Sequence, residues 1–290
     1  MTRTLAELRC DYHRKIEDQI FSLVMGNGGP YPNFADGGSQ SSVLIANGIA
    51  ERLKFNPQPQ APKVTGQTAG SLFERITCEF VEASFESIRH LRPGEWAYMT
   101  AQTKIHNFAQ YRHLDELQSM VRGNSALSSA LGHGYLVTPD IVVARHPVTT
   151  DQVNAPGKFL DDSEGTLLTP FLSKDQTEVV PFLHASISCK WTIRSDRSQN
   201  TRTEALNLMR NRKGRLPHIV AVTAEPLPMR IASLALGTGD LDCVYHLALD
   251  ELRETCATTP QLVDQAEILE TMVQGQRLRD IRDLAFDLAV

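Results

Sequence analysis

Residues 184–215 read HASISCKWTIRSDRSQNTRTEALNLMRNRKGR, a strand pattern followed by a polar run and then a helix pattern. Polar and apolar side chains alternate over HASISCKWTI, and this period of two predicts a half-buried strand. Ser188 and Lys190 are then neighbours on its polar face, because alternate residues of a strand point the same way. RSDR, residues 194–197, has no apolar anchor, whereas TEALNLMRNR, residues 203–212, has the periodicity of a helix.

Basic residues gather in this stretch, although the whole chain has a net charge of −5. The eight basic residues are Lys190, Arg194, Arg197, Arg202, Arg210, Arg212, Lys213 and Arg215. Only Asp196 and Glu204 oppose them between Lys190 and Arg215. A local basic patch on an acidic chain predicts a polyanion bound at one place. The alternative is a solvated helix end with ordinary surface arginines.

With 290 residues, 41% of them hydrophobic and 22% charged, the chain has the composition of an ordinary soluble globular protein. No apolar run approaches the roughly 18 residues of a membrane span, and the N-terminus has no apolar signal core. The five cysteines are Cys10, Cys78, Cys189, Cys243 and Cys256. Because they are scattered and show no zinc-ligand spacing, we expect a cytoplasmic protein without a zinc module.

The remaining chain alternates between helix and strand patterns. Helices are expected at residues 4–25, 41–55, 68–91, 105–123 and 259–274, and strands at 94–101, 135–145 and 216–226, while 241–252 begins as a strand and turns helical. Gly- and Pro-rich loops are expected at 26–39 and 56–65, and an excursion between two core strands at 146–180. From residue 68 to 226 the order is helix, strand, strand, strand, helix, strand. This order predicts an α/β fold with a mixed central sheet flanked by helices.

Three side chains in these elements suit hydrolysis of a phosphodiester. Asp140 follows Pro139 in an apolar strand pattern, where a carboxylate is costly unless it is paired or binds a cation. Asp140 and Glu204 could hold Mg²⁺, which prefers oxygen ligands, while Lys190 orients the attacking water. The alternative for Asp140 is a bulge position satisfied by backbone amides. Glu74 lies beside the apolar stripe of its helix, where such glutamates are commonly only solvated.

Other kinds of site fit less well or remain open. A Ser188–Lys190 acyl-transfer dyad lacks both GxSxG and SxxK, and LGTGD at 236–240 fails the dinucleotide pattern. RSDR suits base reading, because arginine grips guanine with two bonds and a carboxylate accepts from cytosine. An internal Arg–Asp ion pair in a surface loop is the alternative for RSDR.

Pro139-Asp140 followed by x-Lys at Lys190 resembles the PD-(D/E)xK nuclease motif, with Ser188 at the position that is usually acidic. Longer segments resemble the NgoMIV family of type II restriction endonucleases, which recognise CCGG-centred sites. These segments are SISCKWTIRSDR (186–197), LNLMRNRKGRLPHIV (206–220), TAEP and ALGTG-D (within 223–240), GQT-G-x-x-FE (66–74) and TPDIVV (138–143). The resemblance covers nearly the whole chain and is weakest at residues 1–30 and 146–180.

The resemblance implies one endonuclease domain over residues 1–290, with a catalytic core at about 66–226, N-terminal helices and a C-terminal extension. It implies Mg²⁺-dependent hydrolysis of both DNA strands by water, without a covalent intermediate. The catalytic residues that it implies are Asp140, Ser188, Lys190, Glu204 and Glu74. The metal ligands that it implies are Asp140, Glu204 and Cys189.

The resemblance also implies how double-stranded DNA is recognised. Arg194, Asp196 and Arg197 would read CCGG from the major groove, and Gln67 would reach it from the minor-groove side. Asp36 and Ser39 in the Gly-rich loop, with Arg230 after the last core strand, would extend the site to GCCGGC. The family further implies a homotetramer, built as a dimer of dimers, a bacterial cytoplasm and a companion DNA methyltransferase.

Two other functions remain open. A catalytically inactive relative would bind the same DNA sequence without cutting it, although Asp140, Lys190 and Glu204 are all present. A repair or recombination nuclease would act on structured DNA, and a base-reading motif such as RSDR argues against it.

Overall fold

The structure is a computed structural model, and it describes most of the chain. The described residues are 3–26, 28–56, 65–100, 103–124, 129, 137–161, 163, 165, 167–173, 179–193, 195–237 and 239–290, without the side chains of 195–198. None of the helices among them is long and apolar enough to cross a membrane.

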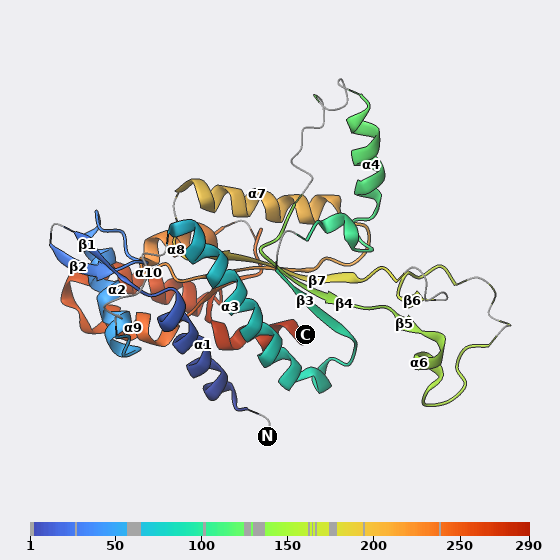
Figure 1. Cartoon of the computed structure of the whole chain (residues 1–290), viewed down its shortest axis with the longest axis horizontal. Coiled ribbons are helices and arrows are strands. Elements are labelled where there is room, and N and C mark those ends of the chain that lie inside the picture. Colours follow the sequence, from blue (N-terminus) through green and yellow to red (C-terminus); the bar gives the residue numbers. More distant parts are fainter. Residues whose placement is uncertain are drawn as a thin grey trace.

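Helices and strands alternate along the chain, as Figure 1 shows. The α-helices are α1 (Leu5–Gln19), α2 (Gln40–Arg52), α3 (Gly66–Ser87), α4 (His113–Arg122), α6 (Thr150–Asn154), α7 (Ser195–Asn211), α8 (Pro228–Ala235), α9 (Leu249–Thr258), α10 (Val263–Gln274) and α11 (Leu284–Leu288). The strands are β1 (Leu23–Gly26), β2 (Gly29–Pro32), β3 (Trp96–Met99), β4 (Ile141–Arg145), β5 (Val148–Thr149), β6 (Leu172–Ser173), β7 (Phe182–Lys190), β8 (His218–Thr223), β9 (Cys243–His246) and β10 (Leu278–Asp280). Short 3-10 helices lie at Arg89–Leu91, Ile105–Asn107, Pro260–Leu262 and Ile281–Asp283.

A six-stranded sheet with the order β10-β9-β8-β7-β4-β3 forms the centre of the molecule. Strands β10, β9, β8 and β7 run parallel, whereas β4 is antiparallel to both β7 and β3. The register places Ile187 opposite Ile141 on one side and opposite Val220 on the other. The expected mixed α/β fold is therefore confirmed, and β7 lies at its centre.

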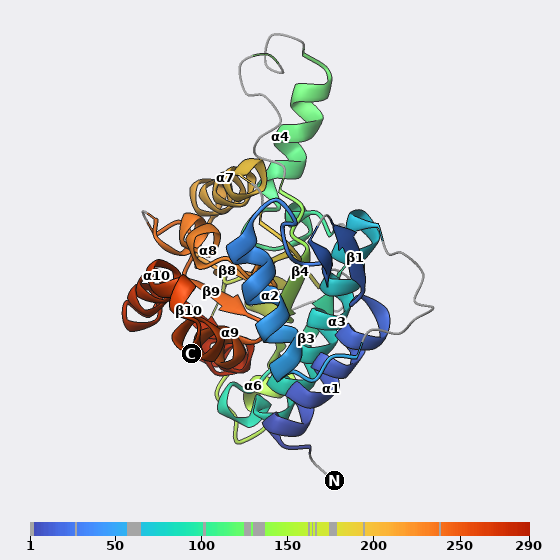
Figure 2. The same cartoon turned by 90° about the vertical axis from the view of Figure 1, so that its left-hand side faces the viewer.

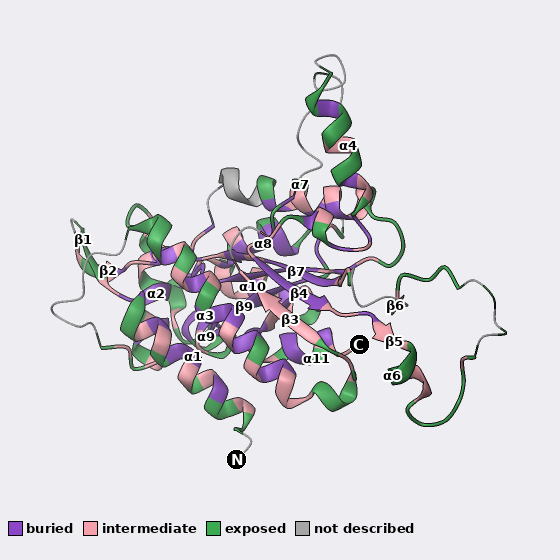
Figure 3. Cartoon of the chain, turned by 45° about the vertical axis from the view of Figure 1, so that its right-hand side comes forward, coloured by how far each residue is buried: buried purple, intermediate pink, exposed green. Residues whose placement is uncertain are grey.

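Helices cover both faces of this sheet. Helices α7, α8 and α10 lie on one side of it and α1 and α3 on the other (Figure 2). The strands at the centre are the most buried part of the chain (Figure 3), because both of their faces are covered. Helix α4 and the arm that carries β5, α6 and β6 both project from this body (Figure 1).

Trp191, the first residue after β7, packs against aromatic rings of two other elements. Its ring lies 5.3 Å from that of Phe73 on α3 and 5.7 Å from that of Phe34, measured between ring centroids. Phe34 lies in the Gly-rich loop at residues 26–39, and a side chain at Gly37 in that loop would collide with the Tyr31 hydroxyl. The carboxyl end of β7, the start of α3 and the Gly-rich loop are thereby packed together.

Several expected boundaries differ from the structure. The helix after β7 begins at Ser195, well before the expected residue 203. The sequence pattern missed this start because the first turns of the helix are polar and have no apolar periodicity. Strand β4 begins at Ile141, so Asp140 precedes the strand and does not lie inside it. The Gly-rich loop also contributes β2, which pairs with β1 as a hairpin. The helix expected at 259–274 is followed by β10 and α11, two elements that were not among those expected.

Candidate active site

Asp140 and Lys190 meet where two neighbouring strands of the sheet lie side by side. Lys190 Nζ donates to Asp140 Oδ2 over 2.8 Å, and the Ser188 hydroxyl donates to the same oxygen over 3.3 Å. The backbone N–H of Cys189 also donates to Asp140 Oδ2, over 2.8 Å. Asp140 is therefore both held by a backbone amide and paired with a lysine, which combines the two interpretations left open by the sequence.

The pleat of β7 explains this arrangement. Ser188 and Lys190 share one face of the strand, as the period of two predicts, and both reach the Asp140 carboxylate. The Cys189 side chain points to the opposite, buried face, where burial raises the pKa of its thiol well above the ordinary value. The thiol therefore lies on the other face of the strand from the Asp140 carboxylate. Because N–H and C=O of one strand residue point the same way, the Cys189 carbonyl lies on the Asp140 side.

Two further carboxylates approach this pair from the helices on either face of the sheet. Glu74 comes from α3, and its pKa is raised to about 7 by burial and by the charge of Asp140, while Lys190 opposes that rise. Glu204 comes from α7, and burial raises its pKa, with Asp140 and Lys190 again as charged neighbours. Neither glutamate is simply a solvated surface residue. Carboxyl groups with raised pKa values around a charged pair are typical of functional sites.

The donor chemistry of these groups suits a hard divalent cation. Within the described part of the chain, no three His, Cys, Asp or Glu side chains come together closely enough to hold a metal ion by themselves. Mg²⁺ does not need such a cage, because it usually takes one or two carboxylates and completes its shell with water and phosphate oxygens. Asp140, Glu204 and the Cys189 carbonyl can supply the protein oxygens of such a site.

An open pocket of about 990 Å³ begins where β7 ends. The residues that follow the strand, Trp191–Ile193, line it together with the Gly-rich loop, Gly66 at the start of α3, and Arg230 on α8. Arg230 pairs with Asp36 in this pocket, so two of the expected DNA-binding residues from distant parts of the chain are in direct contact. Both side chains remain about a third exposed, at 33% for Arg230 and 39% for Asp36.

The other expected DNA-binding residues lie around the same pocket or outside the described part of the chain. Gln67 is exposed in the first turn of α3, beside Gly66. Ser39 is the N-cap of α2, where its hydroxyl accepts the Ser42 N–H. Arg194 lies outside the described residues. Asp196 and Arg197 lie in the first turn of α7, and their side chains are not among those described.

One carboxylate in this region received no role from the sequence. Glu225 follows β8 in the run TAEP and is fully buried. Its two oxygens accept the backbone N–H groups of Ile193 and Leu227. Burial raises the pKa of Glu225 to about 7, against the opposing effect of these hydrogen bonds and of Arg230. An acidic residue directly after a continuous apolar strand was the available sequence signal.

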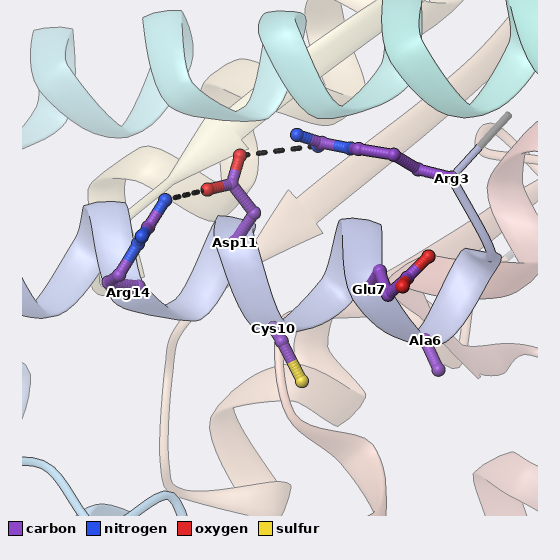
Figure 4. A pocket seen from close by; sticks show the side chains of 6 residues that line it. All are labelled: Arg3, Ala6, Glu7, Cys10, Asp11 and Arg14. Atoms are coloured by element: carbon purple, nitrogen blue, oxygen red, sulfur yellow. Dashed lines mark hydrogen bonds and ion pairs between the residues drawn. The ribbon is translucent and has the colours of Figure 1, made fainter. Parts of the chain in front are cut away.

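A second hollow is lined by residues of α1 and of the segment just before it (Figure 4). Its charged groups pair with each other, since Asp11 contacts Arg3 over 3.3 Å and also contacts Arg14. The remaining lining side chains shown are Ala6, Glu7 and Cys10. Because its charges neutralise each other, this hollow lacks the chemical groups found around Asp140 and Lys190.

A family model and a curated relative match nearly the whole chain. Residues 12–290 match the family model described as NgoMIV restriction enzyme. The chain is 44% identical over 283 residues to the type II restriction enzyme NgoMIV of Neisseria gonorrhoeae, covering 96% of each chain. The solved complex of the restriction endonuclease PspGI with substrate DNA aligns with 92% of this chain and 97% of its own, at 13% identity. Its TM-score of 0.26 is too low to establish a common fold.

Proposed function

Because the chain belongs to the NgoMIV restriction enzyme family and is a type II, site-specific deoxyribonuclease, we propose that it cleaves GCCGGC with Mg²⁺ as cofactor. The observation that carries the catalytic part is the contact between Lys190 and Asp140, with Glu74 and Glu204 as charged neighbours. This set matches the needs of phosphodiester hydrolysis: oxygen ligands for a hard cation and a fixed positive charge beside them.

Each residue of the set has a distinct task in the proposed reaction. Asp140, Glu204 and the Cys189 carbonyl hold the cation, which when bound neutralises phosphate charge and lowers the pKa of water. Lys190 holds the attacking water in line with the phosphorus and offsets the negative charge that develops on the phosphate. Water displaces the 3′ oxygen directly, so the enzyme forms no covalent bond to DNA.

The two remaining side chains adjust this centre. The Ser188 hydroxyl donates to Asp140 Oδ2 and so helps to fix the carboxylate in one orientation. Ser188 thus stands where the related motif has an acid, and Glu204 replaces the missing carboxylate from the following helix. Glu74 adds a carboxyl group whose pKa, raised to about 7, lets it exchange a proton near neutral pH.

Sequence recognition is assigned to the residues that were expected to bind DNA. Arg194, Asp196 and Arg197 read the inner CCGG in the major groove, and Gln67 contacts it from the minor-groove side. Asp36 and Arg230 together read the outer G·C pair, since arginine can donate to guanine while the carboxylate accepts from cytosine. Ser39 is the N-cap of α2 and positions the loop that carries Asp36. Ser39 itself lies beside the DNA. The contact between Asp36 and Arg230 supports a shared target for these two side chains.

A palindromic site that is cut in both strands calls for two copies of one chain related by a two-fold axis. The proposal extends this to a homotetramer, a dimer of dimers that engages two DNA sites at once. The whole chain acts as one endonuclease domain in the bacterial cytoplasm, and a companion methyltransferase protects the host sites.

Digestion of a plasmid of known sequence in the presence of Mg²⁺, followed by end-mapping, tests the proposal. Discrete ends at every GCCGGC and at no other CCGG support both the chemistry and the outer base pair. Cleavage at all CCGG sites would show that Asp36 and Arg230 do not read the outer base pair. Folded wild-type protein that binds GCCGGC but leaves it intact with Mg²⁺ would show that the chain is an inactive relative.

A further inference from the structure

Glu225 is a fully buried carboxylate between β8 and α8, and the proposed reaction does not use it. Burying a carboxylate costs free energy unless hydrogen bonds compensate, and a well-packed apolar side chain is often as stable or more so. The hydrogen bonds that the two Glu225 oxygens accept should therefore explain why a carboxylate stands at this position.

The two Glu225 oxygens hold two segments that come from different parts of the chain. Oε2 accepts the Ile193 N–H over 2.8 Å, and Oε1 accepts the Leu227 N–H over 3.2 Å. Ile193 directly precedes Arg194, the first residue of the RSDR run. Leu227 is the N-cap of α8, the helix that carries Arg230, and Arg230 Nη1 lies 3.9 Å from Glu225 Oε1.

The backbone of Glu225 is also joined to the strand that carries Lys190. The Thr223 hydroxyl donates to the Lys190 carbonyl over 2.8 Å and accepts the Glu225 N–H over 3.0 Å. The Glu225 carbonyl lies 3.2 Å from His246 Nε2 at the end of β9. One buried residue thus lies in a continuous network that connects the end of the catalytic strand with both base-reading elements.

We propose that Glu225 is a positioning residue for sequence discrimination, which sets the spacing between the segment entering RSDR and the start of α8. The inner and outer base pairs are then read by elements that share one rigid support. This inference rests on the proposed function, since it assumes that Arg194 and Arg230 read bases. Glu225 itself touches no DNA in this scheme and acts through Ile193, Leu227 and Arg230.

The test is equilibrium binding, without divalent metal, of wild type and Glu225→Gln to three duplexes. One carries GCCGGC, one has the outer pair changed, and one has an inner pair changed. Wild type is measured first, because failure to prefer GCCGGC would overturn the proposed function and not the role of Glu225. Glutamine keeps the shape of the side chain but offers a single oxygen, so only one of the two N–H groups retains an acceptor.

We expect Glu225→Gln to lower discrimination by about tenfold at both the outer and the inner position, a part of the usual penalty for a wrong base pair. In the Arg230→Ala background, the same change should add little at the outer position and keep its effect at the inner one. Such non-additivity is the mark of residues that act through one another. Equal weakening on all three duplexes would overturn the proposal and leave Glu225 a purely structural residue.

Asp280→Asn is the matched control, because Asp280 is also a buried carboxylate that accepts two backbone N–H groups, those of Leu249 and Arg282. It lies away from the pocket, so its loss should weaken folding without changing discrimination. If Glu225→Gln does not fold, Glu225→Asp keeps the charge and shortens the side chain. Discrimination by a folded Glu225→Asp that equals that of wild type at both positions would also overturn the proposal.

Discussion

Lys190 Nζ lies 2.8 Å from Asp140 Oδ2, although the two residues are 50 positions apart in the chain. The contact forms because β7 and β4 are antiparallel neighbours and Asp140 immediately precedes β4. The side chains remain 18% and 25% exposed, so the ion pair faces the solvent from which a substrate arrives. A lysine and a carboxylate in this arrangement are available to a phosphate, a water and a cation at the same time.

Asp140→Ala, Lys190→Ala and Glu204→Ala should each reduce the cleavage rate by at least about a hundredfold, because each removes a charge that the transition state requires. Specific binding to a GCCGGC duplex should persist, since none of the three is assigned to base reading. Rates come from single-turnover cleavage with Mg²⁺, and affinities from the same variants without metal. Cleavage by Lys190→Ala within a few-fold of wild type would remove Lys190 from the proposed mechanism.

Binding of Mg²⁺ near neutral pH should release protons. The pKa of Glu74 is raised to about 7, so below that pH it carries a proton that a nearby cation would expel. At pH 8 Glu74 is already ionised, and the release should be smaller. Calorimetric titration with Mg²⁺ in two buffers of different ionisation heat measures the proton count. Glu74→Gln should lower the count at pH 6.5, whereas Glu82→Gln on the same helix should not change it.

Arg230→Ala should relax the choice of the outer base pair, with a loss of about 1–3 kcal/mol in discrimination between GCCGGC and sites with another outer pair. The inner CCGG should still be required. Cleavage rates on a set of duplexes that differ only at the outer pair provide the measurement. Arg253→Ala removes an arginine paired with Glu270 on a remote surface and should leave the preference intact. An unchanged outer preference in Arg230→Ala would exclude the proposed contact.

Arg194→Ala should also cost about 1–3 kcal/mol of discrimination, but at one inner base pair. Competition binding with each inner position substituted in turn shows where the preference is lost. Equal weakening for all sequences, together with a salt dependence reduced by about one charge, would identify Arg194 as a phosphate contact instead.

Glu225→Gln should change how stability depends on pH. The folded protein keeps the Glu225 proton up to a pKa of about 7, whereas the unfolded chain releases it near the ordinary 4.5. The folded state then binds more protons between these values, so this group lowers the free energy of unfolding as pH rises from 4.5 to 7. Glutamine does not titrate.

The variant should therefore gain stability relative to wild type between pH 5 and 8, by up to roughly 3 kcal/mol. Urea unfolding at both pH values measures the difference. Asp280→Asn should show no such trend, because Arg9 and Arg282 lower the pKa of Asp280 and keep it ionised throughout this range. A constant difference between Glu225→Gln and wild type would mean that Glu225 is already ionised in the folded protein at pH 5.

Elements with a strong local period could be predicted from the sequence. The alternation around Lys190 predicted β7 and placed Ser188 on the same face, and the period of 3.6 predicted α3, which the structure shows at Gly66–Ser87. The pattern predicts the start of α7 too late, because the first turns of this helix are polar and show no periodicity. Pro139 and Asp140 were placed inside a strand, since an apolar run by itself does not show where pairing begins.

Side-chain patterns were enough to predict the strand–helix unit around Lys190, the type of fold and the set of acidic and basic residues for the site. These follow from side-chain patterns within short segments, where geometry is local. The contact of Lys190 with Asp140, the pairing of Asp36 with Arg230, and the burial of Glu225 between Ile193 and Leu227 depend on how distant segments pack together. The raised pKa values of Glu74 and Glu225 also depend on the tertiary structure, because burial and neighbouring charge arise only when distant segments pack together.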